Sequence, residues 1–251
     1  MTYFRFRNSL LACLLLAGSA FFCTALHAQN TSELGIGLGA TNYRGEISPQ
    51  YQLQNNRPAV TAFYRKDVSV PITVRGALMA GLLRAADDNV TGVNGAVPPL
   101  LAYRQANTKG WLAEASAVVE YNFLDYHRRT DKVHFTPYLF AGLALFYANT
   151  TTVTNNAALA GNFNRQGSQF GVALPAGVGF KYALSQHLNL GLETGVRKAF
   201  TDQLDHLGDQ TPLLVNTHDQ DWYYFSGLSL SYTFYKIPCP DQYKDNTKLL
   251  K

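Results

Sequence analysis

The most constraining feature of this sequence is an alternation between apolar residues and small or polar residues, which recurs in eight separate runs. Successive side chains of a β-strand point to opposite faces, so a period of two predicts strands. None of the runs has the spacing of an amphipathic helix. The predicted strands, with ends good to about 2–4 residues, cover residues 33–43, 58–67, 72–85, 110–124, 133–148, 168–184, 187–200 and 222–235.

The two faces of each run differ in a way that indicates the surroundings. Between residues 187 and 200, Leu188, Leu190 and Leu192 share one face, whereas Glu193 and Arg197 share the other with small residues. A soluble barrel would turn the apolar face inward and carry many charges outside. Charged residues are only 15% of this chain, against roughly 25% in soluble domains. We therefore predict that the apolar face meets lipid and that the small residues fill a narrow interior.

A sheet that is surrounded by lipid must be closed. Hydrocarbon cannot satisfy the unpaired amides of a sheet edge, and bacterial single-chain barrels have even strand numbers. We predict an all-β fold, an eight-stranded antiparallel transmembrane up-and-down β-barrel within residues 29–235. The connections after runs one, three, five and seven are long and the other three are short, as outer loops and periplasmic turns are. This predicts a Gram-negative outer-membrane protein with both termini in the periplasm.

Aromatic residues gather near both ends of the runs, where we predict two girdles at the membrane interfaces. Ordinary enrichment of aromatics in strands is the alternative. Pro175 interrupts its run, and because proline cannot donate to a ladder, we expect a bulge there. The predicted girdle residues are Trp111, Phe146, Tyr147, Trp222, Tyr223 and Tyr224 beside the long connections, and Phe123, Tyr126, Phe135, Tyr182, Phe234 and Tyr235 beside the short ones.

The first residues have the order of a secretory signal peptide. Arg5 and Arg7 precede an uncharged apolar run, and Ala28 offers a cleavage site. We predict a signal peptide at residues 1–28. A membrane-spanning helix is the alternative, since the run is at the lower edge of the ~17–25 residues that cross a bilayer. Cleavage would remove two of the 21 basic residues and none of the 17 acids, leaving 19 against 17. So small a charge argues against a nucleic-acid partner.

Residues 236–251 are predicted to form a periplasmic tail. Cys239 lies in this tail, and the other two of the three cysteines belong to the signal segment. A single cysteine allows neither an internal disulfide nor a cysteine-based zinc site. Cys239 is then either an unpaired thiol or a link to another chain.

Charged side chains fall on the inward face of several runs. Because a buried charge needs a partner, we predict an ion-pair network that plugs the lumen. A gated or selective pore is the alternative. The predicted network comprises Arg65, Arg75, Lys181 and Arg197 with Glu114, Glu120 and Glu193.

Motifs for catalysis are weak. Lipid-deacylating barrels use a His with a nearby Ser, and no His after the signal segment has a Ser two positions on. Asp87-Asp88 and His218-Asp219 resemble the pairs of omptin proteases, but those barrels have ten strands, and Asp in loops usually shapes turns. The acids and His between residues 202 and 209 lack regular cation-ligand spacing. We predict no enzymatic activity, cofactor, metal or small-molecule substrate.

Three stretches carry a family resemblance: ELGIGLGATNYRGEI at 33–47 with RPAVTAFYR at 57–65, LETGVRKAFTDQLDHLGD at 192–209, and YYFSGLSLSYTFYKIPCP at 223–240. They resemble a family of eight-stranded outer-membrane barrels that includes PorG, a component of the type IX secretion machinery. The family usually has an aromatic where this chain has Gln203 and an Asp where it has His206. The resemblance implies a barrel that anchors a secretion complex beside a periplasmic ring of PorK-like and PorN-like proteins.

This resemblance and the basic tail direct attention to the periplasmic side. Besides lipid, we expect the ring proteins as partners, while a small channel, an adhesive barrel and a lipid-modifying enzyme are the alternatives. The residues expected to contact a partner are Tyr126, Arg128, Arg129, Lys236 and Cys239.

Overall fold

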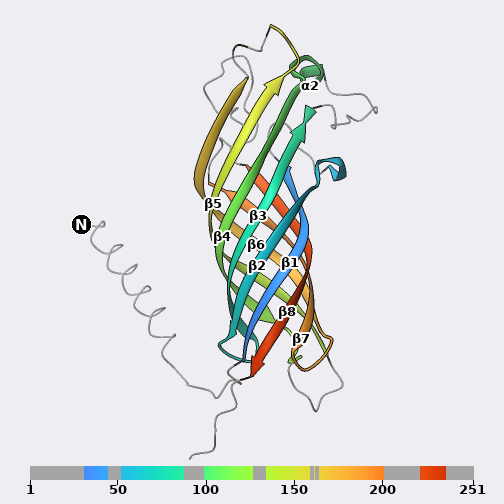
Figure 1. Cartoon of the computed structure of the whole chain (residues 1–251), viewed down its shortest axis with the longest axis vertical. Helices are drawn as coiled ribbons and strands as arrows, with labels where there is room; N and C mark the ends of the chain where they lie inside the picture. The colour runs from blue at the N-terminus through green and yellow to red at the C-terminus, as the bar shows by residue number, and fades with distance from the viewer. Residues whose placement is uncertain are drawn as a thin grey trace, which may run out of the picture.

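The computed structural model describes residues 31–44, 52–87, 99–126, 134–158, 161, 164–200 and 221–235. Eight antiparallel strands form a closed barrel, in which each strand pairs with its sequence neighbours and β8 returns to β1 (Figure 1). The predicted eight-stranded up-and-down architecture is confirmed. The strands are β1 Thr31–Arg44, β2 Arg57–Asp67, β3 Ile72–Ala86, β4 Ala106–Asn122, β5 Phe135–Thr154, β6 Arg165–Ala183, β7 Leu188–Ala199 and β8 Trp222–Tyr235.

The alternation of faces is the one that the sequence predicts. Leu190 on β7 and Leu230 on β8 lie opposite each other, and their side chains are 39% and 45% exposed. Glu193 and Arg197, on the other face of β7, are buried. The apolar face therefore points away from the barrel axis, and the charged and small residues line the interior.

Strands β4, β5 and β6 extend beyond the ends predicted for them, and they rise past the other strands in Figure 1. The extension is rich in threonine, a β-branched residue that favours strands. Thr108 on β4 and Thr152 on β5 share a hydrogen bond of 2.6 Å between their hydroxyl oxygens. Because these strands are longer than predicted, few residues remain between β5 and β6. The β5–β6 connection, residues 155–164, is no longer than the β4–β5 connection, residues 123–134. The expected difference in length is wrong for this pair of connections.

Pro175 produces no bulge. Ala141 lies opposite Ala176 and Ala144 lies opposite Ala173, so β5 and β6 keep one register on both sides of the proline. Pro175 itself lies opposite Arg197 in an unbroken ladder between β6 and β7. The missing proline donor interrupts pairing locally, without adding a residue to the strand.

Glycines on the inward face make room for aromatic rings of neighbouring strands. A Cβ added at Gly179 on β6 would lie 2.3 Å from Cζ of Tyr138, and one at Gly35 on β1 would lie 2.3 Å from Cζ of Phe63. Both distances are far below a van der Waals contact. The rings can cross the lumen because the facing residue has no side chain.

Among the residues that the structure describes, two short helical segments lie outside the sheet, η2 Leu53–Asn55 and α2 Pro99–Arg104. Within the described residues, no helix has the length and apolarity to cross a membrane. Helix α2 is fixed to the barrel mouth by its last residue. Arg104 donates to Asp87 from Nε at 2.9 Å and from Nη2 at 2.6 Å, and Asp87 also accepts the backbone N–H of Ala106 at 2.7 Å.

Candidate functional site: the charged lumen

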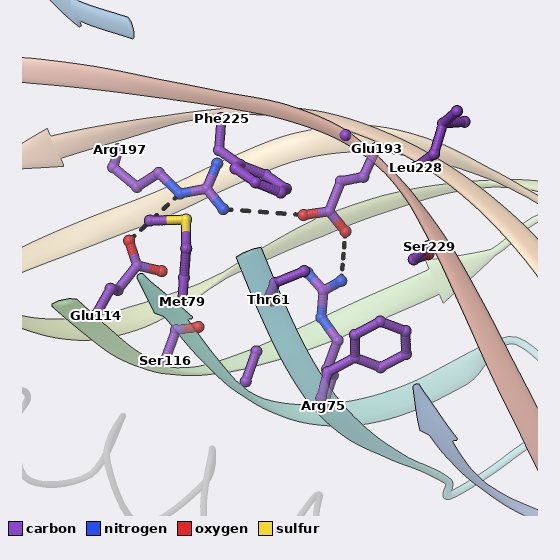
Figure 2. Close-up of a pocket in the computed structure, with 13 residues that line it drawn as sticks. Thr61, Arg75, Met79, Glu114, Ser116, Glu193, Arg197, Phe225, Leu228 and Ser229 are labelled. Carbon is purple, nitrogen blue, oxygen red and sulfur yellow. Dashed lines mark hydrogen bonds and ion pairs between the residues drawn. The ribbon is translucent and has the colours of Figure 1, made fainter. Parts of the chain in front are cut away.

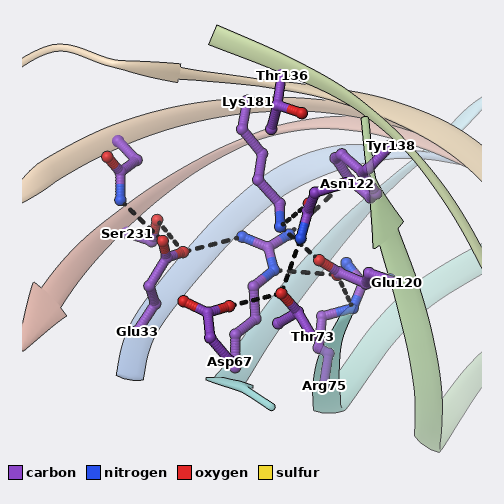
Figure 3. Close-up of polar contacts among 12 residues, drawn as sticks. Glu33, Asp67, Thr73, Arg75, Glu120, Asn122, Thr136, Tyr138, Lys181 and Ser231 are labelled. Carbon is purple, nitrogen blue, oxygen red and sulfur yellow. Dashed lines mark hydrogen bonds and ion pairs between the residues drawn. The ribbon is translucent and has the colours of Figure 1, made fainter. Parts of the chain in front are cut away.

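Glu120 on β4 lies at the centre of a buried ion-pair network. Its Oε1 accepts a hydrogen bond from Arg65 Nε at 3.0 Å and lies 3.0 Å from Arg75 Nε, and its Oε2 lies 2.6 Å from Lys181 Nζ. Figure 3 shows Glu120, Arg75 and Lys181 converging from β4, β3 and β6. One carboxylate thus holds three cations that are far apart in the sequence.

Glu33 on β1 is a second anion of this network. It accepts hydrogen bonds from the Tyr126 hydroxyl at 2.6 Å, from Asn189 Nδ2 at 3.0 Å and from Arg65 Nη1 at 3.4 Å. The sequence prediction omitted Glu33, although the alternation within its run places it on the inward face. With Glu33 included, the buried strand charges balance as Arg65, Arg75, Lys181 and Arg197 against Glu33, Glu114, Glu120 and Glu193.

The network continues toward the long connections through three further ion pairs. Arg75 pairs with Glu193, and Arg197 lies 3.5 Å from Glu114 and 3.9 Å from Glu193. Figure 2 shows these groups around a small internal cavity. The cavity has a volume of about 20 Å³, which is room for about one water molecule. The structure therefore brings all seven predicted lumen residues together in one buried network around this cavity.

Aromatic rings fix the orientation of the cations. The Arg65 guanidinium carbon lies 4.1 Å from the ring centroid of Phe63, and the Arg75 guanidinium carbon lies 5.0 Å from that of Phe140. The Tyr138 hydroxyl donates to Glu193 at 2.9 Å. A cation above a ring face is attracted by the ring quadrupole, by about 2 kcal/mol or more when water is excluded. These contacts favour one arrangement of the charges.

Tyr126, one of the residues expected to contact a partner, has its side chain inside the barrel end. It is buried, and its hydroxyl donates to Glu33, so it closes the lumen at the end where β4 finishes. Burial and the nearby Glu33 carboxylate raise the pKa of the Tyr126 phenol well above its usual value, which keeps the donor protonated. Arg128, Arg129, Lys236 and Cys239 lie outside the described residues, as do the predicted signal peptide and tail.

Three of the predicted girdle aromatics point inward. Phe146, Tyr223 and Tyr126 are buried, and the Tyr223 hydroxyl donates to Glu114 at 2.9 Å. Each occupies an inward position. The alternation of faces, and not closeness to the strand end, therefore determines whether these side chains face the lumen. The other nine predicted girdle residues are exposed or half-exposed. Among them, Trp111 and Tyr147 contact each other with ring centroids 5.4 Å apart.

Sites for catalysis or metals receive little support from the described part of the chain. Asp87 is buried and held by Arg104, so it shapes the barrel mouth. Asp88, His218, Asp219 and residues 202–209 lie outside the described residues. Within the described ranges, no group of three or more His, Cys, Asp or Glu side chains is placed to hold a metal ion.

The outer surface of the barrel carries a band of exposed apolar side chains on every strand. Ile36 on β1 is 69% exposed and Phe170 on β6 is 68% exposed. Soluble monomers rarely expose contiguous apolar patches larger than a few hundred Å². All the glutamates of the described strands point into the lumen instead. Such a surface is suited to hydrocarbon, and closure of the sheet leaves no unpaired edge in it.

Comparison with solved structures finds small barrels of low identity. The attachment invasion locus protein Ail of Yersinia pestis is 12% identical, with a TM-score of 0.46 over 82% of this chain and 99% of that one. A major outer membrane protein of Thermus thermophilus is 16% identical, with a TM-score of 0.47 over 81% and 99%. Neisserial surface protein A is 11% identical, with a TM-score of 0.45 over 81% and 97%.

Sequence comparison gives a family. A search of curated proteins finds no match. One family model, described as "Domain of unknown function (DUF6089)", matches residues 10–242, which is nearly the whole chain. The protein therefore belongs to the DUF6089 family.

Proposed function

We propose that this protein is a non-conducting outer-membrane barrel that anchors partner proteins at its periplasmic end. The apolar outer band and the closed sheet support insertion into a bilayer. The predicted signal peptide supports export. The observation that carries the proposal is the network of buried ion pairs that crosses the lumen, because it leaves the two ends of the barrel as the places where function can reside.

The lumen is a poor path for ions. The cavity beside Arg75, Glu193 and Arg197 has a volume of about 20 Å³, room for about one water molecule, and the charges of the lumen are held in ion pairs across the barrel. To conduct, the barrel would have to separate buried pairs, at a cost of roughly 3–5 kcal/mol for each charge left alone. The geometry thus favours a plug over a channel.

A role in a secretion complex of the type IX kind is supported by the three stretches that resemble the PorG-containing family. Under this proposal, the short-turn end of the barrel, including residues 68–71 and 184–187, faces the periplasm with the tail. Arg128 and Arg129 lie in the sequence between β4 and β5, and Lys236 follows β8. They would contact ring proteins of the PorK and PorN kind.

Crosslinking in the native cell envelope tests this function. A tagged full-length chain is expected to recover periplasmic ring proteins, and a variant lacking residues 236–251 is expected to recover them poorly while inserting normally. An unrelated eight-stranded barrel of equal abundance serves as the control. Recovery of no ring protein by the full-length chain, or equal recovery by the control barrel, would contradict the proposal.

A second candidate function is ligand binding at the outer end. The observation that favours it is the ordered extension of β4 and β5, with α2 fixed by the Asp87–Arg104 ion pair and the Thr154 hydroxyl donating to the Arg104 carbonyl. An ordered platform is what an adhesive surface requires. Whole cells bearing Asp87→Asn should then bind their target surface less well, at unchanged barrel abundance. Unchanged binding would exclude this candidate.

A further inference from the structure

Two like charges lie directly opposite each other on the outer surface. Arg84 on β3 and Lys109 on β4 are cross-strand partners on the outward face, at the end of the barrel with the long connections. Like charges in this position destabilise a sheet. In the described structure neither side chain has an ion pair, and Arg84 Nε is buried without a hydrogen-bond partner. The pair thus carries two positive charges that no described group neutralises, which suits it to bind an anion.

The described protein supplies no anion for this pair. Four glutamates of the strands point into the lumen. The two aspartates at this end are also engaged, because Asp87 is buried with Arg104 and Asp221 accepts the Tyr43 hydroxyl. No other carboxylate of the described residues lies on the outer face at this end. None of the described residues therefore supplies an anion to Arg84 and Lys109.

The position of the pair indicates where that anion resides. Leu82 and Trp111 form the next outward pair toward the middle of the barrel, and both are exposed. With a rise of about 3.4 Å per residue, the cations lie about 7 Å beyond them along the strands. Interfacial aromatics mark the boundary of the hydrocarbon. The cations then lie at the depth of lipid head groups, above apolar side chains that acyl chains can cover.

We infer that Arg84 and Lys109 bind a phosphate group of the phosphorylated glycolipid, lipid A, in the outer leaflet. Arg offers a planar fork of donors that matches phosphate oxygens, and Lys adds a compact charge. A phosphate between the two side chains would remove their repulsion. This inference depends on the proposed membrane orientation, in which the long-connection end faces outward.

Native mass spectrometry of the folded full-length barrel in detergent tests the site. Diphosphorylated lipid A is expected to bind, and Arg84→Gln/Lys109→Gln is expected to weaken binding about 30-fold, the loss for two cations at an anionic lipid surface. Lys66→Gln is the matched control, because Lys66 is an outward, exposed cation at the opposite end of the barrel. This control should bind lipid A like the unmodified chain.

Three results would overturn the assignment: equal affinity in the double variant, equal affinity for dephosphorylated lipid A, or loss of binding in Lys66→Gln only. Displacement by millimolar inorganic phosphate would indicate a free-anion site and would also overturn it. Heat-dependent gel migration reports folding of each variant independently. A barrel that does not fold into detergent or lipid would count against the proposed membrane function, whereas a folded barrel without phosphate preference would count against this site alone.

Discussion

The two halves of the lumen are filled in different ways. The half near the short turns contains Glu33, Arg65, Glu120 and Lys181, joined by ion pairs and hydrogen bonds. The half near the long connections combines the Arg197–Glu114 ion pair with a cluster of buried apolar side chains. That cluster includes Tyr43, Met79, Leu83, Leu112, Phe146, Tyr223 and Phe225.

This difference teaches how a narrow barrel can be closed. The ionic half depends on each partner, because loss of one group leaves others buried and uncompensated. The apolar half depends on volume, because its contacts are non-directional and its cost on truncation is that of a cavity. Substitutions in the two halves should therefore differ in size and in their response to charge.

The largest effect is expected for Glu120→Ala, which removes the carboxylate shared by Arg65, Arg75 and Lys181. The free energy of unfolding should fall by about 3–5 kcal/mol, measured by urea titration of the barrel in lipid vesicles. Lys66→Gln, which removes an exposed charge, is the control and should change it by less than about 0.5 kcal/mol. A loss for Glu120→Ala below 1 kcal/mol, on the order of an exposed pair, would show that the network does not stabilise the barrel.

Truncation in the apolar half should cost less on average. Leu112→Ala removes a fully buried side chain, and the free energy of unfolding should fall by about 2–5 kcal/mol, according to how far the neighbours relax. Leu112→Met keeps the volume and should cost less than about 1.5 kcal/mol. If the Met variant were as unstable as the Ala variant, volume would not be the governing quantity in this half.

Tyr223 joins the two halves through its hydrogen bond to Glu114. Tyr223→Phe keeps the ring and removes the donor, so the free energy of unfolding should fall by about 1.5–3 kcal/mol, as for a hydrogen bond to a charged group. The same urea titration measures it. Tyr232→Phe, at an exposed position of the same strand, should have almost no effect, and an equal loss in both variants would contradict the assigned role of Tyr223.

A smaller effect is expected where the lumen would be overfilled. Gly179→Ala places a methyl group against the Tyr138 ring, and overpacking of this kind costs about 1–3 kcal/mol. Gly76→Ala is the matched control, since a Cβ there meets no atom within 4 Å. Equal unfolding free energies of the two variants would indicate that the lumen has more space than the structure shows.

The fold was predictable because alternation with a period of two is a local property of the sequence. The same alternation also predicts the burial of Glu33, Phe146 and Tyr223. Each of them occupies an inward-facing position when every second residue of its strand is counted. The Thr-rich extensions of β4 and β5 were not predicted, since their polar composition resembles that of loops although Thr favours strands.

The ion-pair partners could not be predicted from the sequence. Parity gives the face of a residue, but the stagger of strands around a closed barrel sets its height along the axis. Arg65 and Glu120 lie on non-adjacent strands and meet across the lumen at 3.0 Å, a relation that no local pattern encodes. Pro175 was misjudged for a similar reason, because neighbouring strands hold its register on both sides.

Planar-bilayer recording tests the central claim most directly, since that claim is a lumen closed by paired charges and apolar side chains. The folded full-length chain should insert without producing stable current steps. Glu120→Ala is recorded for comparison, after heat-dependent gel migration has verified that this variant is folded. Stable, ion-selective openings in the unmodified chain would contradict the account, because they require a continuous water path past the ion pairs that Glu120, Glu193 and Glu114 make across the lumen.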